Sequence, residues 1–218
     1  MGKEARLWAK EHREGNKWNV WQAILVMGAI SGAASYVGIL IGGFISFVNE
    51  DLAQSITSLL SSIIEFALLP MTIGIIVYVV NIVKGKKFEL GQLFCKYNQF
   101  FRIFITNLLV CIFVFLYTLL LIVPGIIRAI SYFLVNYILA DSDFDNLSSG
   151  EILDLSRKIM DGHKAEYFKM NLYYFFMEIV GMFTLGILWI WTIPEMNLAN
   201  AKFATNLIDE YKKNNKEK

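Results

Sequence analysis

The sequence has little of what a chemical active site needs. It contains two histidines and two cysteines in 218 residues, and it has no HExxH, GxSxG or phosphate-loop motif. Cys95 and Cys111 are too few for a disulfide framework or a metal site. Ser156, Asp161 and His163 have the residue types of a catalytic triad, but their spacing across a predicted helix end supports one only weakly. We therefore expect a protein that is not an enzyme and that holds no cofactor and no metal.

Charge is also scarce. Charged residues make up 18% of the chain and hydrophobic residues 56%, and the mean hydropathy is +0.50. A soluble domain of this length cannot bury that much apolar surface. The net charge of +1 argues against a nucleic-acid partner, which would need a basic surface. The composition predicts a membrane protein.

Long hydrophobic runs are what the sequence does have. They cover residues 20–48, 56–83, 101–123, 126–140 and 167–193, and they meet or approach the roughly 20 residues that cross about 30 Å of hydrocarbon as a helix. The runs are continuous and not alternating, so helices are expected and not the strands of a barrel. The first run is too long for a cleavable signal, so we expect it to stay in the membrane.

Lysine and arginine indicate the topology, because cytoplasmic loops are enriched in both. They gather before the first run, between the second and third, after the fourth and in the C-terminal tail. The other two connections carry only Asn49-Glu50-Asp51 and Pro124-Gly125, which we expect to be external turns. A further turn near Thr184-Leu185-Gly186 would split the last run into spans 166–183 and 187–207, the latter broken or kinked at Pro194.

The predicted fold is an all-α, polytopic helical bundle of about six transmembrane helices in three hairpins. We expect one domain over 1–218, with a cytoplasmic amphipathic segment at 1–18, a cytoplasmic loop at 141–166 and a basic cytoplasmic tail at 208–218. The expected location is the bacterial cell membrane, with both termini cytoplasmic. An odd number of spans is the alternative, with 197–211 as an interfacial helix, because Glu195, Asn197, Asn200 and Lys202 are costly in lipid.

Two short amphipathic helices are expected on the cytoplasmic face. Residues 84–102 place aromatic and aliphatic side chains among charges, as a helix lying flat on the membrane does. A second helix begins with a capping box of Ser148 and Glu151 and presents Ile152, Leu155 and Ile159 on one face. Gly162 would end it in the left-handed conformation. If there is a pocket, we expect it beside this helix, open toward the cytoplasmic leaflet.

Glu65, Arg128 and Glu178 are the charged residues of the hydrophobic runs that invite an interpretation. Arg128 follows the Pro-Gly turn by one helical turn, so it can extend to the outer interface, or pair with an acid at similar depth, for which Glu65 is the first candidate and Glu178 the second. A third interpretation gives these residues a role in transport.

The first run also carries glycines at small-xxx-small spacing, Gly28/Gly32 and Gly38/Gly42. Small residues let helix backbones approach closely in lipid. The pairs predict helix packing, either within the chain or against a second copy or a partner.

The run GIIRAISYFLVNYILAD, followed by LSRKIMDGHKAEYFKMNLYYF and TLGILWIWTIP, resembles the DUF975 family of bacterial multi-pass membrane proteins. The residues that correspond to the family signature are Ser131, Tyr132, Tyr137, Asp141, Ser156, Met160, Gly162, His163 and Lys164. The fifth and sixth predicted spans depart from the family pattern at 177–182 and 194–195. The resemblance implies a membrane protein and no particular activity.

Two functions are compatible with these features. The first is a non-enzymatic accessory protein, such as an immunity or envelope-associated factor, that binds another membrane component. The alternative is a small transporter or lipid-handling protein with a polar intramembrane site. The expected partners are the lipid bilayer and either another membrane protein, a membrane-active peptide or a second copy of the chain.

Overall fold

A computed structural model describes residues 1–47 and 49–216, and these residues form helices and no strand. The α-helices are α1 (Gly2–Ser46), α2 (Glu50–Val83), α3 (Phe100–Leu120), α4 (Ile122–Ser131), α5 (Val135–Ala140), α6 (Ser149–Met160), α7 (Lys164–Phe183) and α8 (Trp189–Lys216). Short 3-10 segments connect them: η1 (Leu90–Phe94), η2 (Tyr97–Gln99) and η3 (Ser142–Phe144). The all-α prediction is confirmed.

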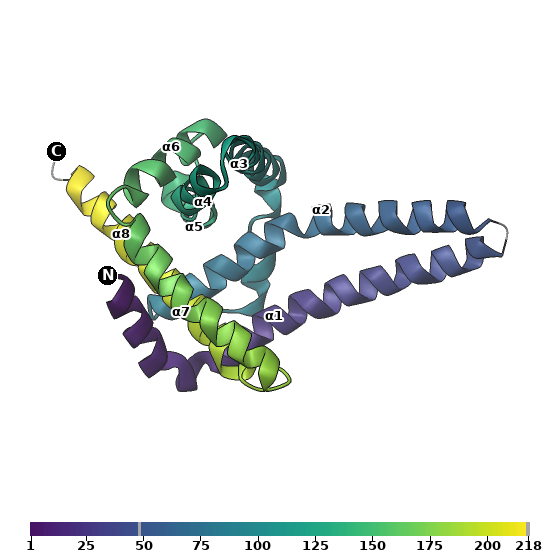
Figure 1. The fold of residues 1–218 in the computed structure, drawn as a ribbon, viewed down its shortest axis with the longest axis horizontal. Helices are drawn as coiled ribbons and strands as arrows, with labels where there is room; N and C mark the ends of the chain where they lie inside the picture. Colours follow the sequence, from purple (N-terminus) through teal and green to yellow (C-terminus); the bar gives the residue numbers. More distant parts are fainter. Residues whose placement is uncertain (48, 217–218) are drawn as a thin grey trace.

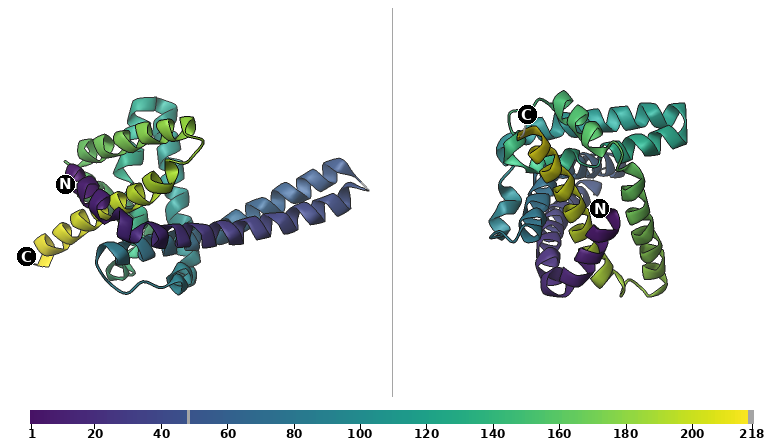
Figure 2. Two further views of the ribbon diagram at one scale, coloured as in Figure 1. Left: turned by 90° about the horizontal axis from the view of Figure 1, so that it is seen from below. Right: turned by 90° about the vertical axis from the view of Figure 1, so that its left-hand side faces the viewer.

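The helices pair into three hairpins, α1–α2, α3–α4 and α7–α8, which leave the body of the molecule in different directions (Figures 1 and 2). The predicted turns of the first and last hairpins are confirmed. Asn49 caps α2 by accepting a hydrogen bond from the Leu52 N–H at 3.0 Å. Gly186 takes φ +84° and donates its N–H to the Gly181 carbonyl at 2.9 Å, a bond typical of a helix end that turns through a glycine.

The turn of the α3–α4 hairpin lies earlier than predicted. Leu121 is extended, with φ −162° and ψ 143°, and α4 begins at the next residue. Pro124 and Gly125 therefore lie inside the first turn and a half of α4. Proline is tolerated near a helix start because its missing N–H has no partner there. At Gly125 a Cβ would lie 2.1 Å from the Thr118 hydroxyl oxygen, so the glycine permits the close crossing of the two helices.

Four segments are long and apolar enough to cross a membrane: Gly2–Ser46, Glu50–Val83, Leu90–Leu120 and Ile122–Ala140. These segments support the prediction of a membrane protein, but the predicted count of six spans is not confirmed. The predicted fifth and sixth spans correspond to α7 and α8, and neither qualifies among the described residues.

Helix α8 lies in the protein core, which explains its polar residues. Leu198, Phe203 and Ala204 are fully buried. Glu195 is bonded to Arg13 at 2.8 Å, and the Lys202 ammonium lies 5.0 Å from the Trp8 ring centre. Glu195 and Lys202 thus find partners in the N-terminal part of α1, and Asn197 donates to the Ile193 carbonyl of its own helix at 2.9 Å.

The core gathers at the base of the α1–α2 hairpin, on the side where α1 begins and α8 ends (Figure 1). The outer half of this hairpin is apolar and exposed, with Phe44 at 81% and Phe47 at 89% of their full accessibility. Apolar side chains exposed on a paired helix are typical of a surface that faces lipid.

The glycines of α1 divide into two groups. Gly38 and Gly42 face α2, where Cβ atoms would approach Leu60 at 3.8 Å and the Thr57 hydroxyl at 2.1 Å. Gly28 and Gly32 have no described atom within 4 Å of an added Cβ. Gly38 and Gly42 therefore pack within the chain.

The two predicted cytoplasmic helices have different outcomes. The first prediction is wrong, because the 84–102 segment contains η1 and η2 and not one amphipathic helix. The η1 segment packs tightly on α2, where a Cβ on Gly74 would lie 2.2 Å from the Leu93 carbonyl oxygen. The second helix is confirmed as α6, in which both bonds of the Ser148–Glu151 capping box are present. Its predicted apolar face, Ile152, Leu155 and Ile159, is buried.

Candidate polar pocket between α2, α5 and α8

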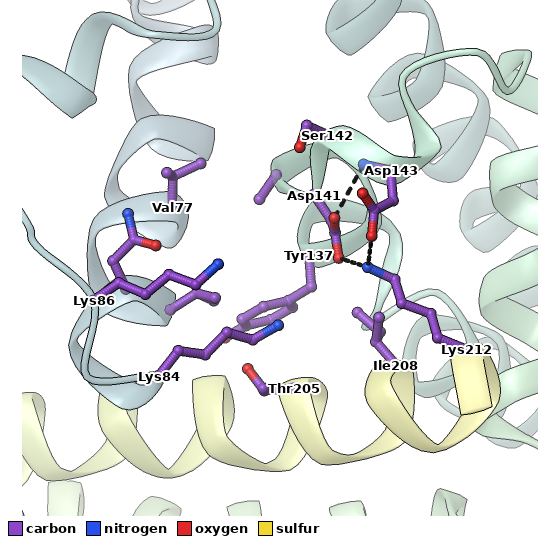
Figure 3. Close-up of a pocket in the computed structure, with 13 residues that line it drawn as sticks. Val77, Lys84, Lys86, Tyr137, Asp141, Ser142, Asp143, Thr205, Ile208 and Lys212 are labelled. Carbon is purple, nitrogen blue, oxygen red and sulfur yellow. Dashed lines mark hydrogen bonds and ion pairs between the residues drawn. The ribbon is translucent and has the colours of Figure 1, made fainter.

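A pocket of about 250 Å³ lies where the C-terminal end of α2 meets α5, η3 and the second half of α8. Figure 3 shows two groups of charged side chains facing each other across it, with the Tyr137 ring between them. Its lining is Val77, Val80, Asn81, Lys84, Lys86, Tyr137, Ala140, Asp141, Ser142, Asp143, Thr205, Ile208 and Lys212.

One wall of the pocket is a lysine held by two carboxylates. The Lys212 ammonium lies 2.5 Å from an oxygen of Asp141 and 2.5 Å from an oxygen of Asp143. Asp141 also accepts the Asp143 backbone N–H at 3.1 Å, which fixes the loop at the start of η3. Burial lowers the pKa of Lys212, but the hydrogen bonds to Asp141 and Asp143 outweigh this and leave the pKa above its ordinary value. A single ammonium group therefore holds both carboxylates of this wall.

The opposite wall carries two lysines from the end of α2. Lys84 forms an ion pair with Asp209 of α8 at 3.1 Å. Lys86 is exposed and makes no ion pair with a described residue. Both side chains extend into the pocket in Figure 3. The lining thus has three ammonium groups and two carboxylates, a net charge of +1.

The floor of the pocket holds a buried hydroxyl group without a partner. Thr205 of α8 is only 7% exposed, and its hydroxyl has no hydrogen-bond partner among the described residues. In Figure 3 this hydroxyl points from α8 toward Lys84 and Tyr137. Buried polar groups almost always have a partner, so this hydroxyl marks a place that a ligand or water completes.

Sequence reasoning placed Tyr137 and Asp141 among the candidate residues, and the structure brings both to this pocket. It brings the other signature residues elsewhere. The Ser156 hydroxyl donates to the Ser131 carbonyl at 2.8 Å, and both serines are buried, so this pair joins α6 to the end of α4. Tyr132 is buried beside Phe113.

The Gly162-His163-Lys164 segment forms the turn between α6 and α7. Gly162 has φ +81°, as predicted for a left-handed helix end. His163 occupies the N-cap position of α7 without a side-chain cap bond, and Lys164 pairs with Asp161 at 3.4 Å. This turn does not line the polar pocket.

The predicted pairing of Arg128 with Glu65 is wrong. The Arg128 guanidinium donates to the Tyr117 hydroxyl at 2.6 Å and stacks on that ring at 4.2 Å, whereas Glu65 is exposed on α2. The prediction compared the depths of the two residues in the membrane, which brings them together only if the helices run side by side. The α3–α4 hairpin instead runs across the α1–α2 direction (Figure 2). Glu178 lies on the exposed side of α7 beside Trp189, so the three charged residues do not converge.

Comparison with known proteins bears on the segment that forms much of this site. Residues 111–210 match the family model described as a protein of unknown function, DUF975. The predicted resemblance is confirmed over these residues. No curated protein and no solved structure matches the chain. The DUF975 segment supplies Tyr137, Asp141 and Thr205 to the pocket, whereas Lys84 of α2 lies outside it.

The sequence analysis did not single out Lys84, Thr205 or Lys212. The two lysines were counted only as topology markers, although each lies near an acidic residue of a distant helix. Thr205 carries no sequence signal, because a threonine within a helix is ordinary until its neighbours are known. These three residues needed the tertiary structure to be found.

Proposed function

We propose that the protein is a multi-pass protein of the bacterial cell membrane that acts as a non-catalytic accessory factor. In this proposal both termini and the polar pocket face the cytoplasm, and the pocket binds an acidic group of another membrane protein or of a membrane-active peptide. The lysines and arginines around the base of the α1–α2 hairpin support this orientation, since cytoplasmic segments are enriched in them.

The observation that carries the proposal is the excess of hydrogen-bond donors in the pocket. Both lining carboxylates are engaged by Lys212, whereas Lys86 forms no ion pair and the Thr205 hydroxyl has no hydrogen-bond partner among the described residues. A carboxylate of a partner would accept from both of these donors at once, and hydrogen bonds to a charged acceptor are stronger than neutral ones. The size of the pocket, about 250 Å³, suits a side chain or a chain terminus.

The positions of the charged residues within the apolar runs support an accessory role over transport. A transport path needs polar groups that line one route through the membrane. Glu65 is exposed on α2, Arg128 bonds to Tyr117, and Glu178 lies on the outside of α7. The polar groups that do converge lie at the basic end of the hairpin.

A photo-crosslinking amino acid placed at position 86 in cells tests this proposal. We expect a discrete adduct with one membrane protein or peptide, which mass spectrometry can identify. The matched control is position 87, the next lysine, which is exposed and lies outside the pocket. Lys84→Gln should reduce the adduct at position 86. Equal adducts at both positions, or an adduct that Lys84→Gln leaves unchanged, would contradict the proposal.

Thr205→Val separates binding from stability. Valine has the shape of threonine but lacks the hydroxyl, which has no partner in the described chain. We expect the free energy of unfolding in detergent to stay equal or rise by up to about 1 kcal/mol, because a buried unsatisfied group is removed. The adduct at position 86 should nevertheless decrease. A clear loss of stability would show that the hydroxyl has a structural partner instead.

A further inference from the structure

A second cavity lies on another part of the molecule, between the α3–α4 hairpin, α6 and the start of α7. Its volume is about 650 Å³, and it shares no lining residue with the polar pocket. Four cationic side chains line it, Arg128, Arg157, Lys158 and Lys164, together with the carboxylates of Asp154 and Asp161. The lining carries a net charge of +2.

An apolar chamber of about 260 Å³ adjoins this cavity. The two share Tyr117, Arg128, Asp154 and Arg157, so they lie side by side. The chamber is otherwise lined by mostly apolar residues: Leu109, Phe113, Tyr132, Gly150 and Leu153. We call the cavity and the chamber together the Arg128 groove. It has a cationic end and an apolar end.

The cationic end is not neutralised by its own carboxylates. Asp154 bonds to Arg157 at 3.1 Å, and Asp161 to Lys164 at 3.4 Å. Arg128 has no carboxylate within ion-pair distance in the described chain and contacts only the Tyr117 ring and hydroxyl. Lys158 also lacks an ion pair there, and its ammonium lies 5.5 Å from the Tyr211 ring centre. Arg128 therefore faces the groove without a countercharge, and Lys158 lies at the edge of the groove toward α8.

We propose that the Arg128 groove binds an anionic phospholipid, with the phosphate at Arg128 and Lys158 and an acyl chain in the apolar chamber. A guanidinium group matches two phosphate oxygens at once, which favours phosphate over a simple anion. The exposed apolar tip of the α3–α4 hairpin lies beside the cationic end, since Pro124 and Ile127 line that end and Leu119, Leu120 and Ile122 are each at least 70% exposed.

The test is a lipid titration of the full chain in neutral detergent, read by native mass spectrometry. Phosphatidylglycerol is the probe, and phosphatidylcholine and inorganic phosphate are the comparisons. We expect phosphatidylglycerol to bind at least about tenfold more tightly than phosphatidylcholine, and Arg128→Gln to weaken it about tenfold, as loss of a charge-assisted contact does. Inorganic phosphate at matched concentration should not displace the lipid.

The variants make the result decisive. Lys158→Gln changes an exposed residue of α6 and tests the same end of the groove if Arg128→Gln fails to fold by circular dichroism. Lys87→Gln is the matched control and should leave lipid binding unchanged. Lys86→Gln, which changes the polar pocket, should also leave lipid binding unchanged. A failure of the lipid proposal can therefore be told apart from a failure of the proposed function. Equal binding of the two lipids, displacement by inorganic phosphate, or unchanged binding in folded Arg128→Gln and Lys158→Gln would overturn the assignment.

Discussion

The carboxylate of Glu195 is the most deeply buried acidic group that the structure describes with an ion-pair partner. It is 5% exposed, accepts from Arg13 at 2.8 Å and from the Tyr174 hydroxyl at 3.4 Å, and joins the two ends of the chain. A buried pair adds little net stability over an apolar pair, but breaking it leaves the other charge without compensation. At the scale of single residues, this contact explains why α8 is a core helix.

Glu195→Gln should therefore lower the free energy of unfolding in detergent by roughly 2–3 kcal/mol, because half-buried Arg13 then keeps only the exposed Glu14 as a countercharge. Thermal unfolding followed by circular dichroism measures this. Glu14→Gln is the control: Glu14 pairs with Arg13 and Lys17 at the exposed surface and should have little effect. Equal effects of the two changes would mean that the Arg13–Glu195 contact does not organise the core.

At the scale of the elements, one close backbone contact depends on a glycine that the sequence pattern did not mark. Gly74 lets η1 lie against α2, and a Cβ there would meet the Leu93 backbone at 2.2 Å. The spacing of Gly28 and Gly32 drew attention in the sequence, yet neither has a described atom near an added Cβ. Spacing indicates which residues share a helix face, but not which face meets another segment.

Gly74→Ala should cost about 2–3 kcal/mol, since the methyl group forces η1 away from α2 and backbone atoms cannot rotate aside. Gly28→Ala should instead raise stability by about 0.5–1 kcal/mol through helix propensity. Chemical denaturation of the two variants beside the natural protein measures the difference. A neutral Gly74→Ala would show that η1 does not pack as described.

The loop after α5 is held to the start of α3 by a second charged cluster. Asp145 lies 3.1 Å from the Lys96 ammonium and 3.5 Å from the Arg102 guanidinium, and the Lys96 side chain is buried. Burial raises the pKa of Asp145, but hydrogen bonds from Gln99 and Lys96 and the two positive charges outweigh it, so the pKa lies below its ordinary value.

A lowered pKa in the folded state means that Asp145 stabilises the fold above the unfolded pKa of about 3.9 and loses this contribution as pH falls through the lower folded value. Asp145→Asn should thus be less stable than the natural protein at pH 7, and the difference should shrink steadily below pH 4. Thermal unfolding at several pH values in one detergent shows the trend. A difference that is independent of pH would assign the effect to packing.

A feature could be predicted from the sequence when the residues that form it are close together in the chain. The α6 helix was predicted correctly because its capping box and apolar face involve neighbours only three or four residues apart. The α1–α2 and α7–α8 turns were also correct, since charge and glycine mark them locally. The partner of Glu195 lies 182 positions away, and Arg128 bonds within its own hairpin, so neither could be read from local pattern.

At the scale of the whole molecule, the three hairpins leave one core (Figures 1 and 2). The polar pocket and the Arg128 groove share no lining residue. The central claim is that the α1–α2 hairpin crosses the membrane with its tip outside and the polar pocket at the cytoplasmic face. The exposed apolar outer half of the hairpin and the basic residues at its base support this arrangement.

Cysteine labelling of intact cells tests this claim most directly. Cys95 and Cys111 are both exposed and would first be changed to alanine. Single cysteines would then replace Glu50, at the tip of the hairpin, or Lys86, at the pocket. The account predicts that a membrane-impermeant thiol reagent labels position 50 in intact cells and position 86 only after the membrane is permeabilised. Labelling of position 86 in intact cells, with none at position 50, would contradict it.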